Sequence, residues 1–262
     1  MIKLIKVSVV ILVCISLAAS SVCMASETEC RSWYIKRNGT KPPTPPPDYN
    51  LLKEYGAYYI DDSLQENEKR IYLTFDAGYE NGNIERILDT LDKEGIKAAF
   101  FVLDNLIIKN TELVKRMAEN GHLVCNHTKN HKNLTKFGRE DIIADLSSLE
   151  NVYREYTGYE LAKYFRFPEG KYSEASLQCV SEMGYKTVFW SFAYADWDNC
   201  RQPKRDFAIK KVLDNTHNGA IFLFHPTSKT NADIMPYLVS EWKNMGYEFG
   251  TLDELTKNES RA

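Results

Sequence analysis

From residue 71 onward, short runs of β-branched and aromatic residues alternate with longer amphipathic segments. Between residues 83 and 94, for example, apolar residues recur at helical spacing, and Gly95 follows as a stop signal. Strands that alternate with helices require a parallel sheet, because each helix returns the chain to the same edge. Roughly six or seven such units without a break predict an α/β fold, a distorted or incomplete (β/α) barrel.

The same patterns place the individual elements. Strands are expected at 71–75, 98–103, 122–126, 164–167, 185–192, 220–225 and 247–250. Helices are expected at 83–94, 111–119, 139–156, 174–183, 206–215 and 234–245.

The N-terminal part of the chain reads differently. Lys3 and Lys6 precede an apolar run at 7–19, and small residues follow, so residues 1–25 are expected to be a signal peptide or an uncleaved membrane anchor. The run is short for a span of roughly 20 residues. Five prolines between residues 41 and 49 favour extended backbone, which predicts a proline-rich arm over 26–64 leading into a domain at 65–257.

Composition excludes some functions. The net charge is -3 and the pI about 6.0, so no nucleic-acid partner is expected. The 12% aromatic content suits a carbohydrate groove, although a tyrosine-rich core would explain it as well. Irregular spacing of the cysteines beyond the leader argues against a zinc ribbon and supports no disulfide prediction; these are Cys30, Cys125, Cys179 and Cys200.

Polar residues collect where the predicted strands end. In parallel α/β folds, functional sites form at the carboxyl ends of the strands. Five predicted strands end in or are followed by a residue suited to catalysis or metal binding: Asp76, His127 with His131, Arg166, Asp196 and His225.

Each of these residues has a plain structural interpretation when taken alone. His127 and His131, four residues apart, could converge on a metal ion or be two surface histidines. Asp76 could be a general base or a turn residue, and His225 could be a core histidine. Arg166 is costly to bury unless it meets a carboxylate, for which Asp76 and Asp196 are candidates. Together they are much more specific than any one of them.

Taken in order, the motifs resemble those of carbohydrate esterase family 4, the polysaccharide deacetylase or NodB-homology family. The motifs are Thr74-Phe75-Asp76-Ala77-Gly78, His127-Thr128-x-x-His131, Arg166-x-Pro168-x-Gly170, Asp196-Trp197 and Leu223-x-His225. The resemblance runs from about residue 65 to 255. Within the family the chain resembles the delta-lactam-biosynthetic de-N-acetylases of spore-forming bacteria, partly through Phe-Asp-x-Gly-Tyr-Glu-Asn-Gly at 75–82.

The resemblance implies a distorted barrel and assigns roles to its residues. Asp76 would be the general base, held by Arg166, and His225 the general acid, tuned by Asp196. A divalent metal, with zinc favoured, would be bound by His127 and His131. Substrate binding would fall to Trp197, Leu223, Tyr79, Pro168 and Gly170, with Trp197 and Leu223 around the acetyl methyl.

The resemblance also implies a substrate and a place of action. It implies de-N-acetylation of N-acetylmuramic acid in peptide-free peptidoglycan strands, leading to muramic delta-lactam in the spore cortex, by an exported and monomeric enzyme in the cell wall or cortex space. The alternatives are a deacetylase of chitin oligomers or of N-acetylglucosamine in peptidoglycan, and a catalytically dead glycan-binding module.

One position departs from the family pattern. Ala77 stands where the family has a second aspartate that binds the metal, and a methyl group cannot be a ligand. The ion would then be held by two histidines and water, be bound weakly, or recruit Glu80.

Overall fold

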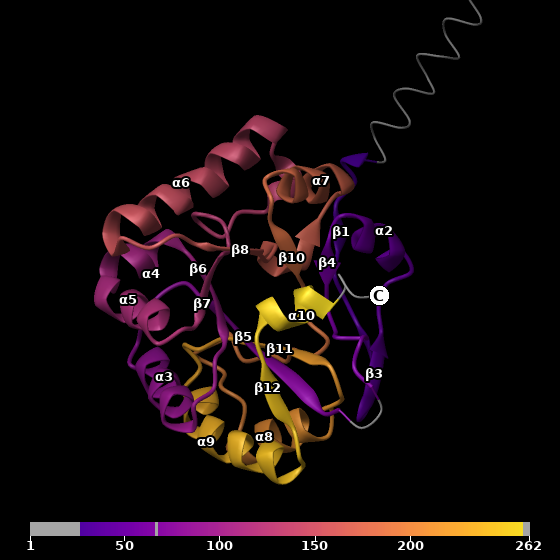
Figure 1. Ribbon diagram of the computed structural model, residues 1–262, viewed down its shortest axis with the longest axis vertical. Helices are drawn as coiled ribbons and strands as arrows, with labels where there is room; N and C mark the ends of the chain where they lie inside the picture. The colour runs from indigo at the N-terminus through magenta and orange to yellow at the C-terminus, as the bar shows by residue number, and fades with distance from the viewer. Residues whose placement is uncertain (1–26, 66–67, 259–262) are drawn as a thin grey trace, which may run out of the picture.

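The computed structural model describes residues 27–65 and 68–258, and its centre is a parallel sheet curled into a distorted barrel (Figure 1). The spatial order is β11-β5-β6-β7-β8-β10-β4, with β12 beside the start of β5. The strands are β4 (Ala57–Tyr58), β5 (Arg70–Ala77), β6 (Ala99–Val102), β7 (Leu123–Asn126), β8 (Ala162–Phe165), β10 (Lys186–Val188), β11 (Ala220–Phe224) and β12 (Glu248–Gly250). The predicted α/β barrel is confirmed.

The two edges of the sheet meet through single bridges rather than a continuous ladder. Ile60, just after β4, bridges Ala220, and Phe192 bridges Phe222. The predicted strand at 185–192 is therefore too long: β10 ends at Val188. Beyond it the chain changes partner, because Phe189 still bonds to β4 whereas Phe192 bonds to β11.

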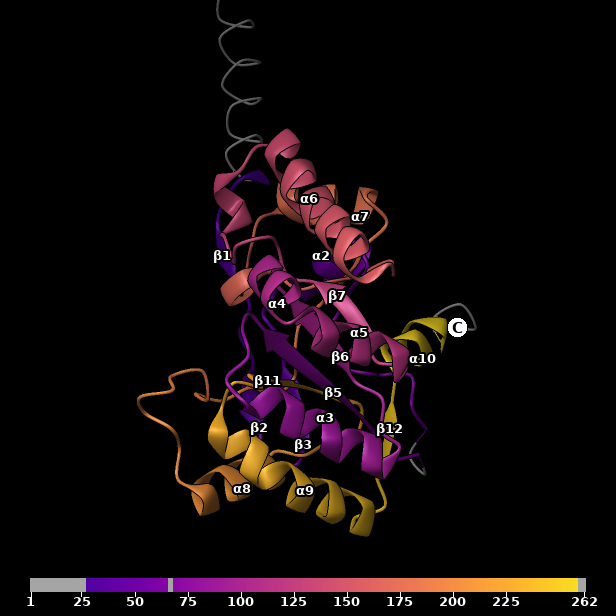
Figure 2. The same cartoon turned by 90° about the vertical axis from the view of Figure 1, so that its left-hand side faces the viewer.

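Helices surround the barrel, as the views in Figures 1 and 2 show. They are α2 (Tyr49–Glu54), α3 (Asn83–Glu94), α4 (Asp104–Lys109), α5 (Thr111–Glu119), α6 (Arg139–Thr157), α7 (Glu174–Glu182), α8 (Arg205–Leu213), α9 (Lys229–Asn244) and α10 (Leu252–Asn258), with 3₁₀ turns η1 (Leu134–Lys136) and η2 (Pro168–Gly170). The predicted helix at 234–245 begins earlier, at Lys229, because the Ser228 hydroxyl caps α9 by accepting from the Asn231 N–H.

Alternate residues of the strands fill the inside of the barrel. Tyr72 and Phe101 pack there with Leu252 and Leu255 of α10, which covers the end where the strands begin. The Tyr164 hydroxyl in β8 donates to Asp253 Oδ1 of the same helix at 2.7 Å. The opposite end, where the strands terminate, is left for polar side chains.

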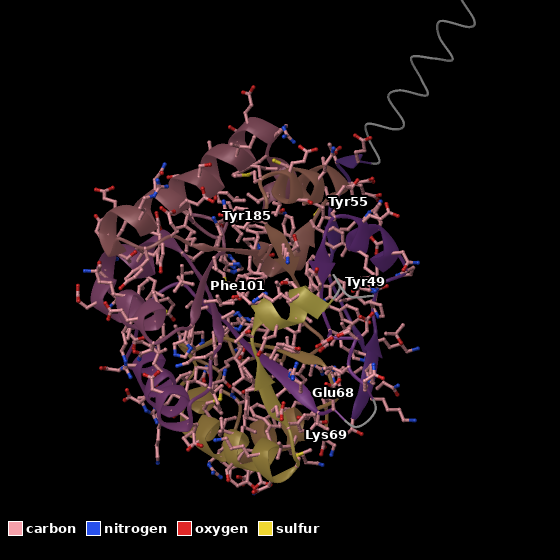
Figure 3. All side chains as sticks on the ribbon, in the orientation of Figure 1. Tyr49, Tyr55, Glu68, Lys69, Phe101 and Tyr185 are labelled. Atoms are coloured by element: carbon pink, nitrogen blue, oxygen red, sulfur yellow. The ribbon has the colours of Figure 1, made fainter. Side chains whose placement is uncertain are left out.

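The proline-rich arm is joined to the barrel at several points. It contains β1 (Arg31–Ser32), which pairs with β9 (Lys171–Tyr172), the hairpin of β2 (Lys36–Asn38) and β3 (Lys41–Thr44), and β4, which is a strand of the barrel itself. The Tyr55 hydroxyl donates to Glu174 at the start of α7 (3.1 Å; Figure 3 labels Tyr55).

The predicted leader at 1–25 lies outside the described residues. Within the part that is described, no helix is both long enough and apolar enough to cross a membrane. Cys30, Cys125, Cys179 and Cys200 are all free thiols.

Candidate active site

A cleft of about 710 Å³ lies over the carboxyl ends of the strands. Its walls include seven of the residues predicted from the sequence: Asp76, Tyr79, His127, His131, Trp197, Leu223 and His225. Arg166 and Asp196 lie behind this wall, where both are buried and each holds one of the cleft residues. Distant parts of the sequence thus converge on one concave surface.

Arg166 holds Asp76 from inside the barrel. Its Nη1 donates to Asp76 Oδ1 at 2.8 Å, and its Nη2 donates to Thr74 Oγ1 at 2.8 Å. The guanidinium also donates to the carbonyls of Val188 and Phe189 and lies 4.2 Å above the ring of Phe101. These bonds satisfy a fully buried cation, and they leave Asp76 Oδ2 directed away from the arginine.

The surroundings keep Asp76 ionised. Burial alone would raise the pKa of this carboxyl, but the charge of Arg166, with His127 and His225, outweighs burial and holds the pKa below its usual value. Asp76 is therefore a carboxylate at neutral pH and can accept a proton.

His225 and Asp196 form a second hydrogen-bonded pair. His225 Nδ1 lies 2.7 Å from Asp196 Oδ1, and Asp196 Oδ2 accepts the His225 backbone N–H at 2.9 Å. Asn231 of α9 fixes the carboxylate by donating to Oδ2 at 2.6 Å. Burial lowers the pKa of His225, but the bond to Asp196 and the charges of Asp196 and Asp76 more than offset it, so the pKa lies above its usual value. This imidazole is prepared to carry a proton.

His127 presents a nitrogen without a partner. Its Nδ1 donates to the Arg166 carbonyl oxygen at 2.8 Å, which leaves the lone pair on Nε2. Nε2 is buried, has no hydrogen-bond partner, and lies 3.5 Å from Asp76 Oδ2. Burial lowers the pKa of His127 to about 4, so the ring is neutral at pH 7. A buried, unprotonated imidazole nitrogen without a hydrogen-bond partner is a potential metal ligand.

His131 lies beside His127, with their ring centroids 5.0 Å apart. The turn between them has left-handed backbone at Thr128 (φ 68°) and at His131 itself (φ 55°). Among the described residues, no group of three or more His, Cys, Asp or Glu side chains is arranged to hold a metal ion. The two histidines are thus a half-site whose remaining ligands would have to come from water or substrate.

Neither Ala77 nor Glu80 supplies a third protein ligand for a metal ion. Ala77 is buried in an apolar cluster and also lines the cleft, but its methyl group cannot bind a metal ion. Glu80 uses its carboxylate to accept the N–H groups of Gly82 and Ile84 at the start of α3. The option that Glu80 completes the metal site therefore finds no support in this geometry.

The predicted substrate-binding residues separate into two groups. Trp197 is 61% exposed, and its ring centroid lies 6.0 Å from that of His225, while Leu223 and Tyr79 complete this side of the cleft. Pro168 and Gly170, in contrast, are buried and are not part of the cleft wall. In η2 the intervening residue, Glu169, lines the cleft instead, and the substrate-binding roles of Pro168 and Gly170 stay predictions.

Several wall residues were not predicted from the sequence: Leu103, Glu169, Trp190, Ala193, Tyr194 and Thr227. Glu169 has left-handed backbone (φ 56°), which is strained for a residue with a side chain and marks it as a candidate functional residue in the structure. The sequence does not reveal such a backbone angle. Trp190 follows β10 where the chain changes partner, which only the fold makes visible.

Comparisons with known proteins agree with this geometry. The family model for polysaccharide deacetylase matches residues 63–188. The chain is 35% identical to the peptidoglycan-N-acetylmuramic acid deacetylase PdaA of Bacillus subtilis, over 86% of this chain and 85% of that protein. The solved structure of Bacillus subtilis PdaA, a family 4 carbohydrate esterase, superimposes with a TM-score of 0.84, covering 88% of this chain and 99% of that one at 34% identity.

A second relative differs in the sugar that its name specifies. The peptidoglycan-N-acetylglucosamine deacetylase PgdA of Listeria monocytogenes is 35% identical over 72% of this chain and 39% of that protein. Sequence, fold and site geometry lead to the same conclusion: the chain belongs to the polysaccharide deacetylase family, carbohydrate esterase family 4.

Proposed function

We propose that this protein hydrolyses the N-acetyl amide of N-acetylmuramic acid in peptide-free peptidoglycan, releasing acetate and leaving a free amine. The observation that carries the proposal is that one cleft holds both a carboxylate fixed by an arginine and an imidazole fixed by an aspartate, at the ends of the paired strands β5 and β11. Amide hydrolysis needs both a base for the attacking water and an acid for the departing nitrogen.

Asp76 is the proposed base. Its Oδ2 takes a proton from water as the water oxygen attacks the acetyl carbonyl carbon. Arg166 keeps the carboxylate ionised and fixes its direction, so that little reorganisation is needed during the step. A positioned base of this kind typically contributes about 10²–10⁴-fold.

His225 is the proposed acid. The C–N bond breaks as the imidazolium gives its Nε2 proton to the amine, and the Nδ1 side stays bonded to Asp196. Asp196 stabilises the charged ring before transfer and keeps its orientation afterwards. Leu223 and Trp197 provide an apolar surface beside this ring for the acetyl methyl.

His127 and His131 are the proposed ligands of a divalent metal, for which zinc suits neutral imidazole best. The unpartnered Nε2 of His127 supports this assignment. When bound, the metal would supply Lewis-acid polarisation of the carbonyl and acidify a water. Since Ala77 offers no carboxylate, we propose that this ion is bound more weakly than a site with three protein ligands would bind it.

Muramic acid is proposed over other sugars because a relative that matches over 86% of this chain and 85% of its own length is named for that substrate, whereas the N-acetylglucosamine deacetylase of Listeria monocytogenes matches over 72% of this chain and 39% of its own length. The freed amine is near the lactyl carboxyl of the same sugar, so condensation of the two groups with loss of water would close a muramic delta-lactam in the spore cortex. The proposal places the chain outside the cytoplasm, acting as a monomer on glycan strands after export.

Acetate release from three purified glycans tests the proposal: peptide-free muramic glycan, chitin oligomers, and peptidoglycan in which only N-acetylglucosamine carries the acetyl group. We expect the first to react fastest by at least about tenfold, and Asp76→Asn to lose about 10²–10⁴-fold in kcat/KM. The matched control is Asp206→Asn, because Asp206 is a surface carboxylate on α8. Mass spectrometry of the product separates deacetylation from lactam closure.

Two outcomes would replace the proposal with an alternative. Faster release from chitin oligomers or from N-acetylglucosamine units would assign the chain to a different N-acetylated polysaccharide. Binding of glycan without acetate release from any of the three, with zinc added, would indicate a catalytically dead binding module.

A further inference from the structure

The N-terminal arm packs behind the wall of the active-site cleft. Trp33, directly after β1, is 5% exposed although it lies in a segment rich in proline and polar residues. It also lies outside the residues that the polysaccharide deacetylase model matches. The contacts of this buried tryptophan show which segments of the domain it connects.

Trp33 fixes the segment that carries Glu169. Its backbone N–H donates to the Gly170 carbonyl at 2.7 Å, next to the pairing of β1 with β9. A side chain at Gly170 would require a neighbour to move, because a Cβ there would lie 3.0 Å from Trp33 Cβ and 2.8 Å from Trp190 Cη2. The two tryptophans therefore approach each other across this glycine, whose backbone is left-handed (φ 63°).

Trp33 also fixes the segment that carries Trp190. Its ring stacks on Phe189, with centroids 4.5 Å apart and planes inclined by 16°. Its indole Nε1 donates to the Trp190 carbonyl at 3.0 Å. In the same segment, the Phe189 carbonyl accepts from Arg166, the residue that orients Asp76.

We propose that Trp33 is a positioning residue for the cleft: it joins the two segments behind the wall and thereby fixes the ring of Trp190 for contact with the glycan. The inference deepens the proposed function and rests on it for the identity of the ligand. Trp33 touches neither the cleft nor the reacting atoms, so its effect passes through Trp190. An aromatic ring held rigidly in a cleft contributes to binding the sugar in its ground state and transition state alike, which is an effect on KM.

The test compares Trp33→Phe, Trp190→Ala and the double variant in the full chain. Phenylalanine keeps a ring to stack on Phe189, but it removes the indole N–H together with part of the fused ring. We expect Trp33→Phe to raise KM for peptide-free muramic glycan about fivefold, with kcat within about twofold of the wild type. In the Trp190→Ala background, Trp33→Phe should change KM no further, because the side chain that it positions is gone.

Tyr34→Phe is the matched control, because Tyr34 is the adjacent aromatic residue and is 55% exposed. It should leave KM and Tm unchanged. The proposal is overturned if Trp33→Phe lowers Tm while KM stays the same, which would indicate a role in stability alone. It is also overturned if the two tryptophan variants multiply each other's effect on KM.

The glycan-binding constant separates this inference from the proposed reaction. If the wild type releases no acetate, the reaction is wrong, and the same three variants are compared by calorimetric Kd for whichever of muramic glycan and chitin oligomers the wild type binds more tightly. About fivefold weaker binding by Trp33→Phe, absent in the Trp190→Ala background, would then support the positioning role, and unchanged Kd would overturn it.

Discussion

Asp196→Asn tests how a buried carboxylate sets the pH range over which His225 can donate a proton. In the structure the carboxylate is 2.7 Å from His225 Nδ1, and its charge is among the causes that raise the histidine pKa. The protonated ring is the acid, so activity is present below this pKa and is lost as the pH rises through it. Removing the Asp196 charge leaves only the charge of Asp76 to oppose burial, and burial lowers the pKa of His225.

The size of the effect follows from the short contact. An opposite charge within about 4–6 Å commonly shifts a pKa by about 1–3 pH units. We therefore expect the basic limb of kcat/KM to move down by about 1–3 pH units, from above the ordinary histidine value of about 6.5 to below it. On the alkaline side the variant should be about 10- to 10³-fold slower, while below its own limb it should approach the wild type.

The assay is a kcat/KM profile for acetate release between pH 5 and 9, with Tm recorded at each pH. Asp198→Asn is the control, because Asp198 is nearby in the same loop but does not contact His225. An Asp196→Asn profile with the wild-type limb and a uniformly reduced rate would refute the reasoning. Such a result would mean that Asp196 orients the ring without determining when it is charged.

Three further changes test other parts of the site. Arg166→Met should destabilise the protein by about 3–5 kcal/mol in urea unfolding, because Asp76 would remain buried without its partner; a loss below about 1 kcal/mol would contradict this. Trp197→Ala should raise KM for the glycan several-fold with little change in kcat, and an effect on kcat alone would argue against stacking on the sugar. Rigorous chelation should abolish acetate release and zinc should restore it, whereas His127→Gln should bind no zinc by calorimetry; full activity after chelation would remove the metal from the proposal.

Elements with strong local signals were predictable from the sequence. Helix α3 was predicted with its observed bounds, because its apolar stripe is regular and Gly95 ends it in left-handed backbone. The pattern of predicted strands placed Asp76, His127 and His225 at strand ends, and the rule for parallel sheets then predicted that they belong to one site. For Arg166 the sequence left two partners open, and the structure pairs it with Asp76.

Features that depend on tertiary contacts were not predictable. Strand β4 is only Ala57–Tyr58, and it exists because β10 pairs with it. Helix α10 is short, and the role of its apolar residues in covering the barrel depends on tertiary contacts that the sequence does not show. Glu169 was not predicted as a cleft residue, because its place there goes with a left-handed backbone angle, and a glutamate gives no indication of such an angle in the sequence.

Helix α10 closes one end of the barrel. Packed side chains fill its interior, and Leu252 and Leu255 seal the far end. In the described part of the chain, the site residues face the cleft over the strand ends, at the opposite end of the barrel from α10. Under the proposed reaction, acetate forms beside Leu223 and Trp197 in the same cleft that the glycan occupies, so the product leaves on the side of the barrel from which the next water enters.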